Sequence, residues 1–137
     1  MKFMLLVYND ERTLASLQER GQFDPMMRDC FAHVDELAAK GQFVAAQQLD
    51  VSSNAKSVRV RNGKVSATDG PFAETKEVLG GFTMIEAESM EEAVEIASHV
   101  PWATVGTIEV RPVRDIDMVK DNVRSGQAAW DGTTVSG

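Results

Sequence analysis

The chain has 137 residues, of which 43% are apolar and 26% are charged, and its formal net charge is −7 at pH 7. These values predict one globular domain with a core of its own and argue against wholesale disorder. The negative charge argues against nucleic acid or an anionic membrane as the main partner. A single cysteine excludes an internal disulfide and any zinc site built from cysteines.

No segment of the sequence predicts a membrane span, a leader or a cofactor site. The longest apolar run covers residues 3–8, whereas a bilayer requires roughly 20. This run meets the polar residues 9–12 and no small-residue cleavage pattern follows, so it does not resemble a signal peptide. We therefore expect a cytoplasmic protein. Phosphate-loop and dinucleotide motifs do not occur, and we predict no metal and no cofactor.

The first third of the chain predicts a strand followed by helices. Residues 2–8 alternate in two sets that are both apolar, which is typical of a central strand covered on both faces. Leu14 and Leu17 favour a short helix after it. Asp24 and Pro25 predict the start of a longer helix, because Asp caps free amides and Pro fits the first helical position. We expect this helix over residues 25–40.

The middle and end of the chain predict strands, a hairpin and a second long helix. Residues 43–49 and 79–87 favour strands, and residues 58–68 predict a hairpin because the central Asn-Gly accepts the positive φ angles of its turn. Ser89 opens a capping box before a helix that Pro101 ends. The last predicted strand covers residues 105–113.

This order of elements predicts the fold class. Two β-α-β units fold most simply as an α+β, ferredoxin-like β-α-β-β-α-β sandwich, here with an inserted β-hairpin and with both helices on one face of an antiparallel sheet. The first strand then needs cover on its other face. A second copy of the chain is the economical cover, so we expect a homodimer that closes sheet against sheet.

The C-terminal part is predicted to lie outside this fold. We expect one domain over residues 1–115 and a partly flexible tail over residues 116–137. Within the tail, Ile116, Val119 and Val123 favour one or two helical turns. Trp130 is either an incidental aromatic residue or one that docks on the partner subunit or over a pocket.

Residues 68–77, Thr-Asp-Gly-Pro-Phe-Ala-Glu-Thr-Lys-Glu, carry the most distinctive chemistry of the sequence. Asp-Gly-Pro is a turn signal, so Asp69 can simply shape a turn beside a solvated face. Alternatively, the loop presents Asp69 as a catalytic base, with Glu74, Thr75 and Lys76 in contact with a ligand. The lysine would then hold an anionic group.

The same loop carries a family resemblance. Val-Arg-Val-Arg-Asn-Gly-Lys-Val at residues 58–65, the string at residues 68–77 and Leu-Gly-Gly-Phe at residues 79–82 resemble the YCII-related family in its DGPF-containing branch. The start of the chain and residues 109–113 fit as well, so the resemblance covers roughly residues 1–115. It implies a dimeric α/β barrel. The branch is mostly uncharacterised, and some members resemble proteins encoded beside sigma factors, which suggests a regulatory role.

In the wider family, a His–Asp pair is proposed as catalytic, and one relative is a dehydrochlorinase of a chlorinated aromatic. Counting back from Gly41 places that histidine near Cys30, so the pair is not expected here. His33 is either a boundary residue of its helix or a general base that faces a pocket.

Two further residues are candidates for a ligand site. Tyr8 ends the first strand, and Arg111 lies on the last strand, off its apolar face. An arginine there needs an anionic partner, which is either Glu109 or the carboxylate of a ligand.

The sequence is compatible with three functions. The chain is an enzyme that acts on a small anionic or aromatic metabolite in a dimer cavity, or a non-catalytic ligand-binding or regulatory module associated with sigma-factor signalling. The third hypothesis is an assembly protein whose loop is only structural.

Overall fold

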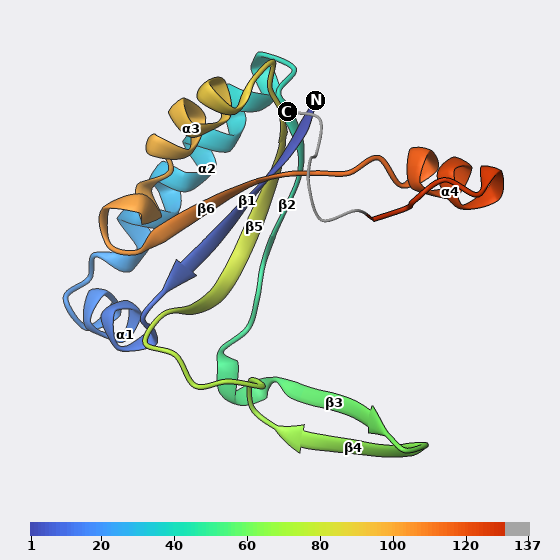
Figure 1. The fold of residues 1–137 in the computed structure, drawn as a ribbon. Coiled ribbons are helices and arrows are strands. Elements are labelled where there is room, and N and C mark those ends of the chain that lie inside the picture. Colours follow the sequence, from blue (N-terminus) through green and yellow to red (C-terminus); the bar gives the residue numbers. More distant parts are fainter. Residues whose placement is uncertain (131–137) are drawn as a thin grey trace.

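The computed structural model describes residues 1–130 as a four-stranded antiparallel sheet with helices against one face and a projecting two-stranded hairpin (Figure 1). The sheet order is β2-β5-β1-β6. The elements, in chain order, are β1 (Lys2–Asn9), α1 (Glu11–Glu19), α2 (Phe23–Ala39), β2 (Phe43–Gln48), η1 (Ser52–Asn54), β3 (Lys56–Arg61), β4 (Lys64–Asp69), β5 (Val78–Glu86), α3 (Met90–Ser98), η2 (Pro101–Thr104), β6 (Thr107–Pro112) and α4 (Ile116–Ser125). The predicted ferredoxin-like fold with an inserted hairpin is confirmed.

The core lies between the sheet and helices α2 and α3. Alternate residues of the central strand β1 point to this side, and Phe3 and Leu5 have no exposed surface. Phe3 is paired with the equally buried Ile85 of β5. Helix α3 begins at the predicted cap, where the Ser89 side chain accepts a hydrogen bond from the Glu92 amide.

The start of α2 differs from the prediction. The helix begins at Phe23, Gln22 occupies the cap position, and no side chain caps the free amides. Asp24 lies instead in the first turn, where its negative charge favours the helix dipole without capping. The predicted short helix after β1 is present as α1, capped by Asp10, which accepts a hydrogen bond from the Arg12 amide.

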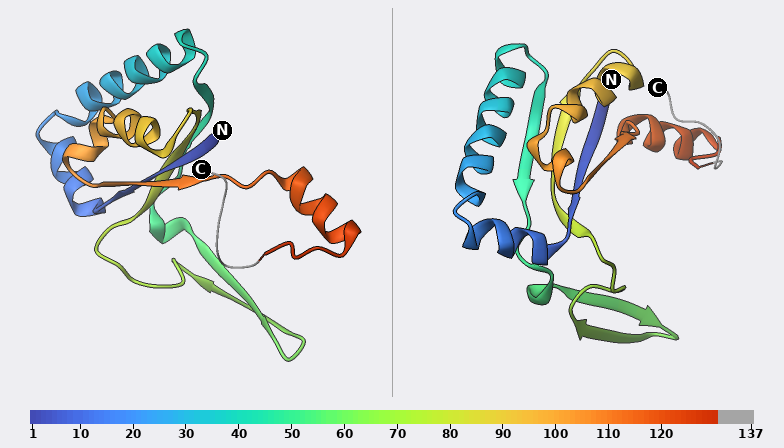
Figure 2. Two further views of the ribbon diagram at one scale, coloured as in Figure 1. Left: turned by 45° about the horizontal axis from the view of Figure 1, so that its top comes forward. Right: turned by 90° about the vertical axis from the view of Figure 1, so that its left-hand side faces the viewer.

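The second face of the sheet carries the other half of β1. Met4, Leu6 and Tyr8 point away from α1, α2 and α3 and are half-buried. Their register places them beside Met84 and Phe82 of β5. We call this surface the open face. The views in Figure 2 show helices α1, α2 and α3 together on the opposite side of the sheet.

The hairpin and the last helix extend away from this body (Figures 1 and 2). Strands β3 and β4 are joined by Asn62 and Gly63, whose φ angles of 52° and 75° fit the predicted turn. Helix α4 is longer than the predicted one or two turns and ends at Ser125, with Gly126 as its C-cap. Trp130 is exposed, and part of the predicted flexible tail, residues 131–137, lies outside the described residues. No helix within residues 1–130 is long and apolar enough to cross a membrane.

Candidate functional site

A cavity of about 620 Å³ lies between helices α1 and α2 and the sheet. The end of β1, η2 and the segment after β2 complete its wall. The lining is largely apolar and includes the side chains of Leu14, Phe23, Met27, Val34 and Trp102. The rings of Phe23 and Trp102 have centroids 5.7 Å apart and are tilted by 49°, so they form an aromatic wall.

Two glycines of β5, Gly80 and Gly81, line the cavity where a side chain would collide with neighbouring atoms. A Cβ at Gly81 would lie 2.7 Å from the backbone oxygen of Gln47, so β2 and β5 approach too closely for a side chain there. A Cβ at Gly80 would lie 2.9 Å from Oδ1 of Asn9. Bare backbone at Gly81 therefore lets β2 approach β5, and bare backbone at Gly80 leaves room for the Asn9 carboxamide.

Asn9 is the most deeply buried polar residue of the cavity lining. The residue is 5% exposed, and its Oδ1 has no hydrogen-bond partner. A buried carbonyl oxygen without a partner costs about 1–3 kcal/mol of stability, so its retention suggests a function.

Helix α2 contributes two titratable groups to the lining, the Cys30 thiol and the His33 imidazole. Burial, with the neighbouring Asp29 charge, raises the pKa of the Cys30 thiol to about 11. The thiol is therefore protonated at neutral pH and is a poor nucleophile. Burial lowers the pKa of His33, so its imidazole is neutral at pH 7 and able to accept a proton.

Two carboxylates at the cavity edge are held by local hydrogen bonds. Glu11 accepts from the amide of Ser52 at 2.8 Å and from its hydroxyl. Asp50 accepts from the Val51 amide and from Asn54, and these bonds lower the pKa of the Asp50 carboxyl. Both groups fix the segment after β2, which lines the cavity. Among residues 1–130, no group of three or more His, Cys, Asp or Glu side chains could hold a metal ion.

The structure places the candidate base Asp69 away from this cavity. Its side chain is 84% exposed, and its Oδ1 lies 2.6 Å from Nζ of Lys56 at the base of the hairpin. It does not line the cavity. In this structure Asp69 is part of an exposed ion pair, and its catalytic role stays a prediction.

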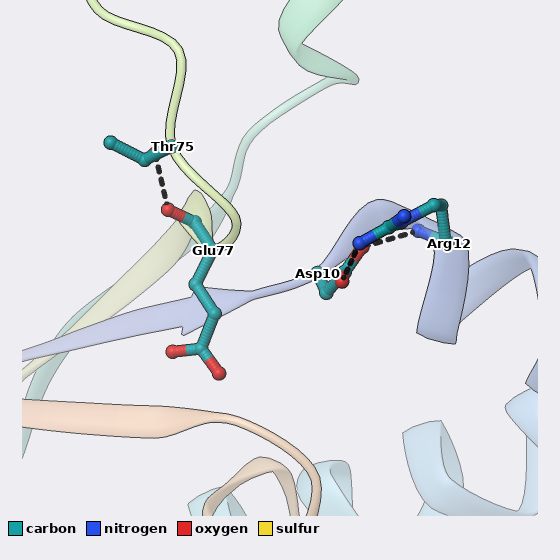
Figure 3. Close-up of polar contacts among 4 residues, drawn as sticks. All are labelled: Asp10, Arg12, Thr75 and Glu77. Atoms are coloured by element: carbon teal, nitrogen blue, oxygen red, sulfur yellow. Dashed lines mark hydrogen bonds and ion pairs between the residues drawn. The ribbon is translucent and has the colours of Figure 1, made fainter.

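The rest of the loop is organised around Glu77. The Thr75 hydroxyl donates to the backbone oxygen of Glu77 at 2.6 Å, and Thr107 of β6 donates to the Glu77 carboxylate at 2.8 Å. Figure 3 shows the contact between Thr75 and Glu77. The same figure shows a separate pair, in which the Arg12 guanidinium donates hydrogen bonds to the Asp10 carboxylate. Glu74 and Lys76 are exposed and lie outside the cavity lining.

Tyr8 and Arg111 meet on the open face through Glu109. The Tyr8 hydroxyl donates to Glu109 at 3.2 Å, and Arg111 donates to the same carboxylate at 2.8 Å. The hydrogen bond from Arg111 is the main cause that lowers the pKa of Glu109. Burial and the adjacent carboxylate raise the pKa of Tyr8. Glu109 thus supplies the anionic partner that the arginine was expected to need.

The predicted site residues therefore occupy three places. His33 lines the cavity, Asp69 to Lys76 lie at the hairpin base and loop, and Tyr8 and Arg111 lie on the open face. Sequence reasoning missed Asn9 and the aromatic wall. The signal for Asn9 was present: an amide residue directly follows an apolar strand, and a Gly-Gly pair lies in a neighbouring strand.

Comparisons with known proteins give a family match, a curated relative and a distant structural likeness. The profile of the YCII-related domain matches residues 1–117. An uncharacterised protein of Rhizobium meliloti (strain 1021), R00369, is 34% identical over 115 residues, which cover 82% of this chain and 92% of that protein. A solved structure of 5-chloro-2-hydroxyhydroquinone dehydrochlorinase from Burkholderia phenoliruptrix AC1100, in complex with 2,5-dihydroxybenzoquinone, is 15% identical with a TM-score of 0.48. That likeness covers 85% of this chain and 98% of the other.

Proposed function

The chain belongs to the YCII-related domain family, and we propose that it binds a small, largely apolar organic molecule in the cavity between α1, α2 and the sheet. The observation that carries this proposal is the cavity itself. Its volume of about 620 Å³ lies within the range of about 300–1,000 Å³ that is usual for small-molecule sites. Its lining joins an apolar wall to a few polar groups, which is the usual composition of such sites.

The wall favours a flat or aromatic ligand. Phe23 and Trp102 present adjacent rings, and Leu14 and Met27 add aliphatic and thioether surface. Burial of an apolar ligand against these side chains is favourable by about 25 cal/mol per Å² of apolar surface removed from water.

Asn9 supports a ligand that carries one polar group. A carboxamide has both donors and acceptors, and rotation about its last side-chain bond exchanges them. A ligand hydroxyl or amine near Asn9 would give its oxygen the partner that it lacks.

Catalysis is the second candidate, and His33 favours it. A neutral imidazole on the cavity lining can take a proton from a bound molecule. In this alternative the chain is an enzyme that acts on a small anionic or aromatic metabolite. The predicted ligand roles of Tyr8 and Arg111 belong to a different place, the open face, and would require a second copy over that face.

The binding proposal is tested with a cavity-filling variant. Ala46 of β2 lines the cavity, whereas Val44 of the same strand is exposed and does not. The probe is the fluorescent apolar dye 1-anilinonaphthalene-8-sulfonate, followed by competition with phenol and benzoate. We expect Ala46→Phe to weaken dye binding about tenfold or more, and the control Val44→Phe to change it by less than about twofold. Equal affinities for both variants would overturn the proposal.

The catalytic alternative has its own experiment. Native mass spectrometry of the purified protein identifies any small molecule that it retains, and that molecule becomes the test substrate. We expect His33→Gln to keep the affinity for this molecule and to lose its turnover if His33 is the base. Unchanged turnover would exclude His33 from the chemistry.

A further inference from the structure

The lining of the cavity between α1, α2 and the sheet contains carboxylates but no basic side chain. Its carboxylates are those of Glu11 and Asp50, and no lysine or arginine of residues 1–130 belongs to it. Hydrogen bonds from the backbone and from a nearby amide side chain lower the pKa of Asp50, which keeps this group ionised in neutral solution. Because burial raises the pKa of Cys30 and lowers that of His33, both are neutral at pH 7. The cavity therefore has no positive side chain that could receive an anionic group.

Neither carboxylate of the lining is neutralised by an ion pair within residues 1–130. Glu11 accepts its hydrogen bonds from Ser52, which is uncharged. Arg12, the basic residue next to Glu11 in the sequence, donates instead to Asp10 (Figure 3). Residues 131–137 contain no lysine, arginine or histidine. A charged ligand near these carboxylates therefore meets uncompensated negative charge.

Two uncharged features of the lining favour a cationic ligand as well. Asn9 Oδ1 is buried without a partner, and an ammonium group supplies the donor that this oxygen needs, whereas a carboxylate does not. The faces of aromatic rings carry negative potential and attract cations, and Phe23 and Trp102 both belong to the lining. Trp102 is only 9% exposed, and attraction between a cation and a ring grows when water is excluded.

From these observations we propose that the cavity selects an apolar or aromatic amine in its protonated, cationic form and disfavours a carboxylate of the same size. This inference rests on the proposed binding function and names the ligand class of that site. The aromatic wall buries the apolar part of the amine, and Glu11 and Asp50 attract its ammonium group. A small anionic metabolite, one of the ligands that the sequence leaves open, is then a poor occupant of this cavity.

The test compares ligands that share one ring and differ in charge. The reporter is N-phenyl-1-naphthylamine, a fluorescent dye without charge, so its own binding does not depend on the carboxylates. Benzylamine, benzyl alcohol and benzoate, which are cationic, neutral and anionic at pH 7, are each used to displace it. We expect benzylamine to act at a concentration about tenfold or more below that of benzoate, with benzyl alcohol between them. Added salt should narrow this difference, because Asp50 is exposed to solvent.

Variants that remove one negative charge locate the source of this selectivity. Glu11→Gln and Asp50→Asn each replace a lining carboxylate by an amide of similar shape. The control Glu19→Gln removes the same charge from an exposed position of α1 outside the lining. We expect Glu11→Gln to narrow the difference between benzylamine and benzoate about threefold or more, and the more exposed Asp50→Asn to narrow it about twofold. Glu19→Gln should change it by less than about 1.5-fold.

The outcomes separate this inference from the cavity proposal. Benzoate that displaces the dye as readily as benzylamine would overturn the inference and leave the cavity proposal intact. A difference that both lining variants leave at its wild-type size, or that Glu19→Gln narrows equally, would also overturn it, because the selectivity would then arise elsewhere. A dye that fails to bind the wild type, or binds Ala46→Phe equally well, would overturn the cavity proposal and this inference with it. Should Glu11→Gln fail to fold, the exposed Asp50→Asn variant decides alone.

Discussion

Strand β1 and the β3–β4 hairpin carry the same kind of apolar alternation, but the apolar side chains are buried in β1 and exposed in the hairpin. In β1, Phe3 and Leu5 have no exposed surface, whereas Val58 and Val65 of the hairpin are more than half exposed. The alternation specifies that a face is to be covered, but it does not specify what covers it. For one side of β1 the cover comes from helices of the same chain. For the hairpin, none of the described residues supplies it.

The largest expected effect lies in the covered region. Leu5→Ala should lower the free energy of unfolding by about 2–5 kcal/mol, because it removes a fully buried side chain and leaves a cavity in the core. Urea unfolding followed by circular dichroism measures this loss. A cost below about 1 kcal/mol would mean that the core under β1 collapses around the smaller residue.

Substitutions of Asn9, which lies between the core and the cavity, should change the free energy of unfolding by smaller amounts and in opposite directions. Asn9→Leu should raise the free energy of unfolding by about 1 kcal/mol, because a shape-matched apolar group replaces the unpartnered Oδ1. Asn9→Asp should lower it by about 1–3 kcal/mol at pH 7, because a carboxylate would be buried there without a partner. Both values come from urea titrations.

The Asn9 pair also bears on function. Asn9→Leu should weaken binding of phenol more than that of toluene, because only phenol brings a hydroxyl to the carboxamide. A destabilised Asn9→Leu variant would show that this oxygen has a partner in solution, such as a bound water. Stability gained together with polar affinity lost would mark Asn9 as a functional residue.

The uncovered region should respond according to concentration. In a dilute monomer, Val65→Ala should change the free energy of unfolding by no more than about 0.5 kcal/mol, since the side chain is exposed. If the exposed valines of the hairpin pack on the second copy of the expected homodimer, the same change should cost more at high protein concentration, because binding stabilises the folded state by mass action. Thermal melts at 2 and 200 μM, roughly a hundredfold apart, compare the two regimes. A concentration-independent cost as large as that of Leu5→Ala would contradict the contrast between the regions.

The fold was largely predictable because its signals are local. Alternation, the Ser89 capping box and the Asn62-Gly63 turn each depend on neighbours in sequence, and the order of elements then selects one topology. The predicted start of α2 at Asp24-Pro25 is two residues late, because Phe23 packs against the core and the helix extends past its best capping residue.

The candidate site was less predictable because it depends on contacts between distant segments. Asn9, Phe23, Gly80 and Trp102 are far apart in sequence and meet only once the sheet and helices pack. The composition of the Asp-Gly-Pro loop predicted a candidate base at Asp69, yet in the structure Asp69 forms an exposed ion pair. Of the candidate site residues predicted from the sequence, His33 is the one that lines the cavity.

The smallest expected effect concerns His33, whose pKa reports how far the cavity wall excludes water. Burial lowers the pKa of His33. The nearby charges of His99 and Lys40 lower this pKa further, whereas the charge of Glu36 raises it. The unfolded chain, with an ordinary histidine pKa of about 6.5, therefore binds more protons in mild acid than the folded chain. The part of the stability that depends on a neutral His33 is then complete above pH 6.5. It is lost as the pH falls from there through the lower folded pKa.

His33→Gln should remove this pH dependence. Urea titrations at pH 5, 6, 7 and 8 should show the wild type losing more stability than the variant between pH 7 and pH 5. At pH 8 the imidazole is neutral in both states, so any difference there reports packing alone. Parallel losses in the two proteins would mean that water reaches the imidazole freely. The α2 wall of the cavity would then be more exposed to water than the packed core around β1, as the valines of the β3–β4 hairpin are.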